Sequence, residues 1–358
     1  SEMCIRDRYV LRRLLMTILV VLVASVVVFT LVYFVPGDPV KILMSPESTV
    51  AELEAKRHSL GLDRPYLVQL GNFLYNAYIK FDLGTSWIRG TSVVEGLAER
   101  LPYTFQLGIL AILVSSFVGI PLGINAAVHQ NCWQDRVCML IGMVCTSVPD
   151  FWIALLMIVL FSQKLNWLPA FGVGGITFLI MPVIAASLKS IGTLARQTRS
   201  SMLEVIRSDY VTTARAKGLK ERSVIYKHML PNALIPIITV IGGSFSGIIA
   251  GTVVIEQVFS RPGVGTYLTQ AITNRDFPII RGCVIILAIF TSVMMLLVDL
   301  AYAVVDPRIK AQYAGQSRKR SHKHGGNPHY WHHHHHDHDG HGHHDHCEES
   351  EKGARKDG

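Results

Sequence analysis

The side chains most able to do chemistry are concentrated near the carboxyl end of the chain, where histidines alternate with carboxylates. Thirteen of the sixteen histidines lie beyond Tyr313. Imidazole nitrogens bind nickel, zinc and copper, and interleaved aspartates add negative charge. The tract therefore predicts a metal-binding tail, with nickel or zinc as the expected ion. The expected ligands are the imidazoles of His332, His333, His334, His335, His336, His338, His341, His343, His344 and His346.

This tract has two interpretations. A purification tag is usually an uninterrupted histidine run, whereas this one is broken by Asp and Gly residues, which favours a native tail. Few apolar residues follow Tyr313, so residues 306–358 are expected to be disordered. A native tail could buffer incoming metal, sense metal in the cytosol, or be a passive extension.

Motifs that build catalytic or nucleotide-binding sites are missing from the sequence. It contains no Gly-Lys dipeptide and hence no phosphate-cradling loop, no His-Glu-x-x-His and no Gly-x-Ser-x-Gly. We therefore expect no catalytic residue, and no cofactor outside the tail. If the protein moves a solute uphill, the energy must come from a partner or from an ion gradient.

The rest of the chain, which must position the chemically active side chains, is mostly apolar. Of the 358 residues, 50% are hydrophobic and 17% are charged, and the mean hydropathy is +0.34. In a soluble chain roughly a quarter of all residues would be charged. The composition excludes an ordinary soluble enzyme and predicts a lipid membrane as the surroundings. The net charge of +8 is explained by where the basic residues lie, without a nucleic-acid partner.

Six apolar runs are long enough to cross a bilayer, which takes about 20 residues. They lie near Leu14–Val35, Thr104–Val128, Val137–Phe161, Ile176–Leu194, Leu234–Phe259 and Cys283–Val305. Four arginines precede the first run and no cleavage site follows it, so residues 9–35 predict a retained first transmembrane helix. Residues 1–8, which begin with Ser, are interpreted as a non-native lead without a structural role.

Basic residues set the expected orientation of the chain in the membrane. They gather at the amino end, between the fourth and fifth runs, and after the sixth run. With an even number of runs these three segments share one side, so both termini are expected in the cytoplasm. The predicted fold class is an all-α integral membrane protein with six transmembrane helices, followed by the disordered His-rich cytoplasmic tail.

A polar segment of residues 36–101 separates the first two runs and is expected outside the cytoplasm. Val50–Leu60 has apolar positions at helical spacing, and Pro65–Ile79 places five apolar side chains on one face. The pattern predicts a small extracytoplasmic helical insert. Such an insert could meet a solute-delivering partner or brace the spans.

The basic segment between the fourth and fifth runs contains a second helical pattern. Asp209–Gly218 predicts a short helix, in which Asp209 could accept from first-turn amides and Gly218 could take the left-handed conformation at the end. Glu221–Leu230 predicts another helix that stops at Pro231. The short helix could dock in a groove of another protein, or the segment could be a solvated loop that only fixes topology.

Three ionisable residues lie within or at the ends of the apolar runs, namely Lys189, Glu256 and Asp299. Ionisable side chains are costly in lipid and usually face the interior of a helix bundle. Lys189 and Asp299 fall toward the same half of the membrane and are interpreted as a structural pair. Glu256 lies beside the turn of residues 259–265 and is the candidate for gating or for contact with a partner outside the cytoplasm.

The basic segment resembles the coupling loop of bacterial ABC importer permeases. The family pattern of Glu-Ala-Ala, three residues, Gly, an apolar position and Leu-Pro stands here as Thr212-Thr213-Ala214, Gly218, Ile225 and Leu230-Pro231. Thr212 replaces the leading Glu of the pattern. The string Ala-Arg-Ala-Lys-Gly-Leu that follows is similar to the peptide and nickel branch of the family.

The resemblance extends from about Tyr9 to Lys310 in short strings whose joint order is specific. The strings are Pro36–Pro39, Leu60–Pro65, Asp82–Ser86, Pro149–Trp152, Glu256 with Phe259, Pro262–Gly265, Arg275–Pro278 and Asp306–Arg308. By these strings the chain resembles the first of the two permease subunits of a dipeptide, oligopeptide or nickel importer.

The resemblance implies a permease core over residues 102–305, with a coupling loop at 195–233, in a bacterial plasma membrane. The implied partners are a second homologous permease, two cytosolic ATPase subunits that hydrolyse ATP, and an extracytoplasmic solute-binding protein. The implied ATPase-coupling residues are Asp209, Tyr210, Thr212, Thr213, Ala214, Arg215, Lys217, Gly218, Leu230 and Pro231. The expected residues for gating or binding-protein contact are Glu256, Phe259, Pro262, Gly263 and Gly265.

Three other functions remain open at this point. Within the family, a dedicated importer of nickel or metal chelates is favoured by the tail. A gradient-driven carrier with a metal-sensing tail would transport its solute with this chain alone. A membrane anchor for a metal store would bind metal without any flux.

Overall fold

The computed structural model describes residues 2–44 and 47–305. Within these ranges the chain is helical and has no strand beyond an isolated bridge between Thr85 and Ser92. The helical fold class is therefore confirmed for this part of the chain. The predicted His-rich tail and its metal site lie outside the described residues. Inside them, no three His, Cys, Asp or Glu side chains gather into a group that could hold a metal ion.

Five helices in the described ranges are long and apolar enough to cross a membrane. A sixth span is obtained if a bent pair of helices is counted as one, in agreement with the six runs of the sequence. Residues 2–8, for which no structural role was expected, form the first turns of the first long helix. The five helices are α1 (Glu2–Phe34), α5 (Val93–Val128), α8 (Thr177–Ile206), α11 (Leu230–Val258) with the turns before it, and α13 (Phe277–Val305).

The third apolar run, expected near Val137–Phe161, is broken in its middle. It forms α6 (Trp133–Ser147) and α7 (Asp150–Met157), which continues into the π-helix η1 (Ile158–Lys164), and the two halves are bent by 98°. Pro149 explains the break. The residue before a proline is driven out of the helical conformation, and Val148 is indeed extended, with ψ 132°.

The segment between the fourth and fifth spans is shorter than predicted because both neighbouring helices are longer. α8 continues to Ile206, and the next long helix already begins with α10 (Glu221–Ser223) and the π-helix η2 (Val224–Met229). The predicted stop at Pro231 is wrong, since this proline lies in the first turn of α11. Proline cannot make the regular helix bond, and the wider π-helical turn before it accommodates that loss.

The polar segment after α1 forms α2 (Pro39–Leu43), α3 (Val50–Ser59) and α4 (Tyr66–Tyr78), which confirms the helices predicted from apolar spacing. α3 begins with a capping box, in which the side chains of Thr49 and Glu52 each accept the other residue's backbone N–H. α5 starts at Val93, well before the predicted Thr104, so the insert is shorter than expected.

α8 is the most enclosed of the long helices. Of its most apolar stretch 67% is buried, against 22–39% in the other four spans. α5 approaches it closely because glycines face it: a Cβ on Gly123 would lie 2.5 Å from the Ala195 carbonyl oxygen. Small residues allow this kind of close approach between membrane helices. The buried residues Ile124 and Ala127 of α5 and Leu194 of α8 flank this contact.

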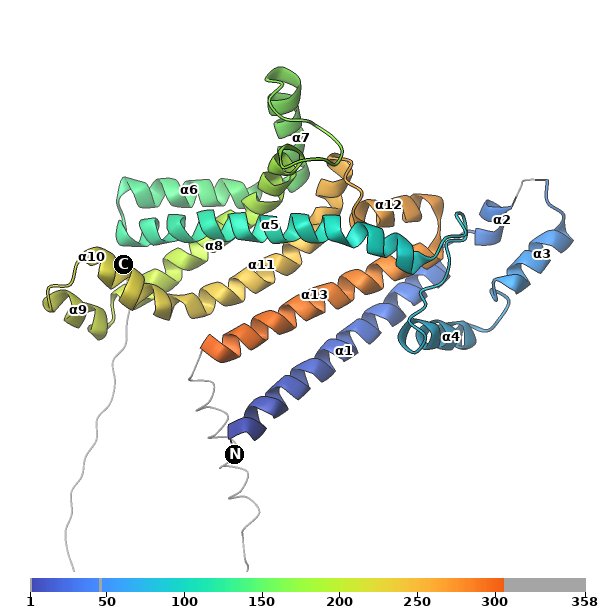
Figure 1. Cartoon of the computed structure of the whole chain (residues 1–358), viewed down its shortest axis with the longest axis horizontal. Helices are drawn as coiled ribbons and strands as arrows, with labels where there is room; N and C mark the ends of the chain where they lie inside the picture. Colours follow the sequence, from blue (N-terminus) through green and yellow to red (C-terminus); the bar gives the residue numbers. More distant parts are fainter. Residues whose placement is uncertain (1, 45–46, 306–358) are drawn as a thin grey trace, which may run out of the picture. The chain divides into compact units, whose positions relative to one another are not determined.

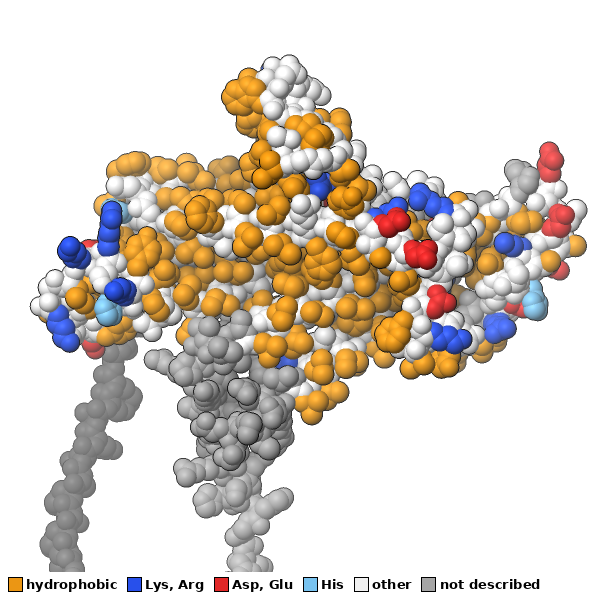
Figure 2. Space-filling model, in the orientation of Figure 1, with side chains coloured by type: hydrophobic (Ala, Val, Ile, Leu, Met, Phe, Trp, Pro, Cys, Tyr) orange, Lys and Arg blue, Asp and Glu red, His pale blue; other side chains and the backbone are white. Residues whose placement is uncertain are grey.

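Apolar side chains cover much of the outside of the long helices, whereas most charged side chains gather near their ends (Figure 2). One end carries α9 (Asp209–Ala216) and α10, and the other carries α2 to α4 and α12 (Val264–Asn274) (Figure 1). Large side chains such as Leu113 and Phe117 are exposed. Soluble monomers rarely expose so much contiguous apolar surface, which therefore indicates contact with acyl chains.

Candidate functional site

α9 is an eight-residue helix whose apolar side is seated on the membrane helices. Val211 is fully buried and Ala214 is nearly so. Because packed interiors are dense and resist deformation, a displacement of α9 would be passed on to the helices beneath it. These helices are α5, α8, η2 and α11, which contribute Ile124, Leu194, Met202, Val224, Met229 and Ile237 among others.

The amino end of α9 differs from the prediction, whereas its carboxyl end agrees. Ser208 is the N-cap residue and no side chain caps the helix, so the predicted capping role of Asp209 is wrong. Asp209 lies in the first turn, where its negative charge still suits the helix dipole. At the other end Gly218 has φ +74°, the left-handed conformation that was predicted.

An ion pair closes the turn around Gly218. Arg215 Nη2 donates to Glu221 Oε1 at 2.6 Å, and Arg215 Nε donates to Glu221 Oε2 at 3.3 Å. These hydrogen bonds raise the pKa of Arg215 above its usual value. Because the pair joins the end of α9 to the start of α10, it ties α9 directly to the fifth span.

The other side of α9 is open to solvent. Tyr210, Thr212, Thr213 and Lys217 are all exposed. Leu230 and Pro231 lie apart from them at the start of α11, and every other predicted coupling residue lies on α9 or in the turn after it. The structure thus presents a small polar surface whose opposite side is anchored among the spans.

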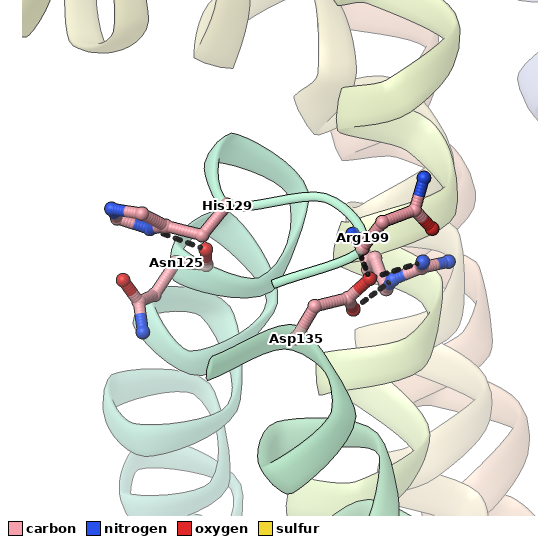
Figure 3. A network of polar contacts seen from close by, with 5 residues as sticks. Asn125, His129, Asp135 and Arg199 are labelled. Atoms are coloured by element: carbon pink, nitrogen blue, oxygen red, sulfur yellow. Dashed lines mark hydrogen bonds and ion pairs between the residues drawn. The ribbon is translucent and has the colours of Figure 1, made fainter. Parts of the chain in front are cut away.

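The turn between α5 and α6 is fixed to α8 by a two-pronged ion pair (Figure 3). Asp135 accepts from Arg199 Nε at 2.6 Å and from Arg199 Nη2 at 2.7 Å. The Asn131 backbone N–H also donates to Asp135, at 3.0 Å. In the same turn His129 Nδ1 lies 3.1 Å from the carbonyl oxygen of Asn125. The Asp135 side chain is only 5% exposed, so this ion pair holds the turn against α8 from a position largely shielded from solvent.

Sequence reasoning treated Arg199 only as a marker of topology and did not single out Asp135. The available signal was one acidic residue directly before an apolar run. Such a residue usually has a partner inside the bundle. Its partner lies 64 positions away, on a different helix, and only the packing of α6 on α8 reveals it.

Glu256 joins three helices at the other end of the spans. Its side chain is fully buried, and Oε1 accepts from the Thr104 hydroxyl of α5 at 2.6 Å. Oε2 accepts the backbone N–H groups of Gly265 at 2.8 Å and Thr266 at 3.2 Å. The Thr104 hydroxyl in turn accepts from the Val264 N–H at 2.9 Å. Together they satisfy the first-turn amides of α12, which has no side-chain cap of its own.

Two glycines permit this arrangement. A Cβ on Gly263 would lie 2.2 Å from the Glu256 carboxylate, and a Cβ on Gly265 would lie 2.5 Å from Val253 Cα. The structure therefore brings the predicted residues together around Glu256, with Phe259 also buried. Only Pro262 of this set is partly exposed. Their role in gating or partner contact stays a prediction.

Arg261 lies beside the same carboxylate and was not singled out in the sequence. The residue is 2% exposed, its Nη1 lies 3.5 Å from the Phe178 carbonyl oxygen, and its Nε has no hydrogen-bond partner. Burial lowers the pKa of this guanidinium, and the nearby charge of Glu256 opposes that shift. The junction therefore holds one acidic and one basic side chain, both buried.

Three of the strings that carry the family resemblance meet at this end of the molecule. The Ser86 hydroxyl donates to the buried Asp276 carboxylate, which also accepts the Trp87 N–H at 3.2 Å. The neighbouring Arg275 donates from Nη1 to the Pro36 carbonyl oxygen at 3.2 Å. The strings thus serve to fasten the insert to the turn between α12 and α13.

The chain belongs to the family described as the binding-protein-dependent transport system inner membrane component, which matches residues 119–311. The amino-terminal component of the same transport systems matches residues 6–108. A putative peptide transport system permease protein of Brucella abortus is 40% identical over 309 residues, which cover 84% of this chain and 98% of that relative. The dipeptide transport system permease protein of Alkalihalophilus pseudofirmus is 37% identical over 330 residues, with 84% and 99% covered.

A solved structure shows the same fold at low sequence identity. The methionine ABC transporter MetNI, in an inward-facing conformation, matches with a TM-score of 0.53 at 16% identity, over 59% of this chain and 96% of that chain. The family match and the long apolar helices together identify the protein as a multi-pass inner membrane permease subunit of an ABC importer. The relatives place it among the peptide transport permeases.

Proposed function

We propose that this chain forms one half of the pathway through which an ABC importer carries dipeptides or oligopeptides across the bacterial plasma membrane. The observation that carries this proposal is α9, a polar surface backed by buried Val211 and Ala214 and tied to the fifth span by Arg215 and Glu221. Such a helix can receive a push from outside the membrane and pass it to the spans. A second homologous permease would form the other half.

In this proposal two cytosolic partner subunits hydrolyse the ATP. When they close on ATP, the partner that holds α9 would move it as a rigid body, and the cluster beneath α9 would rotate the spans between inward-open and outward-open states. In this arrangement both termini and α9 lie in the cytoplasm. The insert lies on the opposite side, where a solute-binding protein would deliver the peptide.

The choice between peptide and nickel rests on two observations that favour different cargoes. The relatives at 40% and 37% identity are named as peptide and dipeptide permeases, which supports a peptide. The histidine tract of the sequence supports nickel as the second candidate. The tract could also bind nickel or zinc in the cytosol without affecting what the pathway carries.

Uptake by the complete importer in proteoliposomes separates these cargoes. We expect ATP-dependent uptake of a radiolabelled dipeptide that unlabelled nickel does not reduce. A matched chain truncated after residue 313 should take up the dipeptide at the same rate. Uptake of labelled nickel that an excess of dipeptide leaves unchanged, with no dipeptide uptake, would replace the peptide proposal by the nickel one.

A further inference from the structure

Arg281, in the second turn of α13, carries a guanidinium without an acidic partner in the part of the chain that the structure describes. Its Nε donates to the Phe277 carbonyl oxygen at 3.3 Å, a neutral acceptor in its own helix. Neither Nη nitrogen has an acceptor among the described residues, and no carboxylate lies within 4.0 Å of the guanidinium there. A guanidinium has five N–H donors, so most of them lack a protein partner.

Three aromatic rings surround this cation. Arg281 Cζ lies 5.0 Å from the ring centroid of Phe29, 5.4 Å from that of Phe73 and 5.9 Å from that of Trp87. The rings come from α1, from α4 and from the segment before α5. Cation–π contacts offset part of the cost of holding the charge away from water, but they supply no acceptor to the Nη hydrogens.

The unpartnered side chain lines two neighbouring cavities. One has a volume of about 230 Å³ and the other of about 580 Å³. The larger is also lined by the carboxylate of Asp82 and by the amide side chains of Asn72 and Asn76 of α4, and these two amides make no side-chain hydrogen bond to another described residue. Arg281 therefore faces a space that could admit a group the size of a phosphate, with further amide donors in its wall.

The position of Arg281 along the membrane-spanning helices indicates where a phosphate group would come from. α1 ends at Phe34 and α13 begins at Phe277, so Arg281 lies where two apolar spans reach the edge of the hydrocarbon layer. Tyr33 and Tyr66 pack together beside it, and tyrosines favour the interface between acyl chains and headgroups. Val35, which directly follows α1 and lines the smaller cavity, is 40% exposed, so the mouth of the cavity is continuous with an apolar surface suited to an acyl chain.

We propose that the Arg281 cavity binds the phosphate of a phospholipid from the leaflet on the side of the insert. The guanidinium holds two phosphate oxygens through its paired donors, a geometry in which Arg is stronger than Lys. The acyl chains lie along the exposed face of α1. Because the insert, α1 and α13 all meet the cavity, the bound lipid holds the insert against the spans, whichever solute the importer carries.

Native mass spectrometry of the complete importer, taken from vesicles of dioleoylphosphatidylglycerol, tests this site. The wild type should retain one phospholipid per complex that Arg281→Gln loses, with retention reduced about tenfold or more. Arg281→Lys should retain an intermediate amount. The matched control is Arg89→Gln, which removes an exposed arginine of the segment before α5 and should retain the lipid fully.

A second variant tests the same cavity if Arg281→Gln does not fold. Asn76→Trp fills the larger cavity and leaves residue 281 unchanged, and it should also lose the phospholipid. Equal lipid retention in the wild type and in the folded Arg281 or Asn76 variants would overturn the proposal. Displacement of the lipid by a radiolabelled dipeptide, in a manner that depends on Arg281, would also overturn it and would assign the cavity to the solute.

Discussion

Thr104 of α5 and Glu256 of α11, 152 positions apart, form a 2.6 Å hydrogen bond inside the junction with α12. The same hydroxyl and carboxylate take up the first amides of α12. A carboxylate this deeply buried is normally satisfied by such donors. The residue singled out for gating is therefore also the one that holds α12 to the spans.

Replacing Glu256 by Ala should destabilise the protein by about 3–5 kcal/mol, because several buried donors lose their acceptor. Thr104→Val should cost about 1–2 kcal/mol, since it removes one hydroxyl from the same network. Thermal unfolding of the purified chain in detergent measures both. Equal stability of the Glu256→Ala variant and the wild type would show that the network contributes nothing.

The gating role of Glu256 needs a variant that remains assembled. Glu256→Gln keeps the shape of the side chain and one oxygen acceptor, so it should assemble and hydrolyse ATP while its solute uptake falls severalfold. The comparison of uptake with ATP hydrolysis in the complete importer gives the readout. Unchanged uptake with intact assembly and coupling would remove Glu256 from the gating candidates and leave it a structural cap.

Two Gly→Ala substitutions should differ because the glycines serve different purposes. Gly263→Ala places a Cβ 2.2 Å from a buried carboxylate, so we expect misfolding or a loss of about 3 kcal/mol or more. Gly218→Ala meets open space and suffers only the strain of φ +74°, about 1 kcal/mol. Expression yield and melting temperature rank the two, and a reversed order would contradict the packing described around Glu256.

The sequence predicted the helical fold and most of the spans because lipid imposes a simple rule of about 20 apolar residues per crossing. It also located α9, through the left-handed Gly218 after a short helical pattern. It did not indicate the break at Pro149, and it wrongly ended a helix at Pro231. One breaks a run, whereas the other is absorbed by a π-helical turn, and that difference depends on the surrounding packing.

The site was less predictable than the fold because its partners are distant in sequence. Glu256 stood out as an acid in an apolar run, but nothing in the sequence paired it with Thr104. Asp135 and Arg199 likewise meet only after α6 packs on α8. Capping of α12 by a side chain of another helix lies outside the local capping patterns that sequence reasoning uses.

Asp135 and Arg199 should behave as a coupled pair in a double-mutant cycle. Arg199→Met leaves a buried carboxylate without its partner and should cost about 3–5 kcal/mol. The double variant Asp135→Asn with Arg199→Met should recover at least half of that loss, because no uncompensated charge remains. Melting temperatures of the four proteins give the coupling energy, and simple additivity would contradict a direct interaction.

The capping box of α3 should make that helix sensitive to acid. Hydrogen bonds from Thr49 lower the pKa of Glu52 below its ordinary 4.5. The ionised carboxylate of Glu52 thus stabilises the helix at any pH above 4.5, the pKa of Glu52 in the unfolded chain. This stabilisation is lost as the pH falls through the lower pKa that Glu52 has in the folded chain. The protection of the α3 amides against exchange, relative to an unfolded chain at the same pH, should fall in that range, and Glu52→Gln should abolish this pH dependence. An unchanged profile in Glu52→Gln would assign the acid sensitivity to other groups.

The exposed side of α9 is expected to couple ATP hydrolysis to uptake. Thr212→Trp places a large side chain on that surface, and its matched control Thr273→Trp makes the same change on the exposed side of α12 at the other end of the spans. We predict that the complete importer with Thr212→Trp loses ATP-dependent dipeptide uptake at least tenfold, whereas Thr273→Trp keeps the wild-type rate. Full uptake by Thr212→Trp, or uptake by this chain without any ATPase subunit, would show that α9 does not couple ATP hydrolysis to transport.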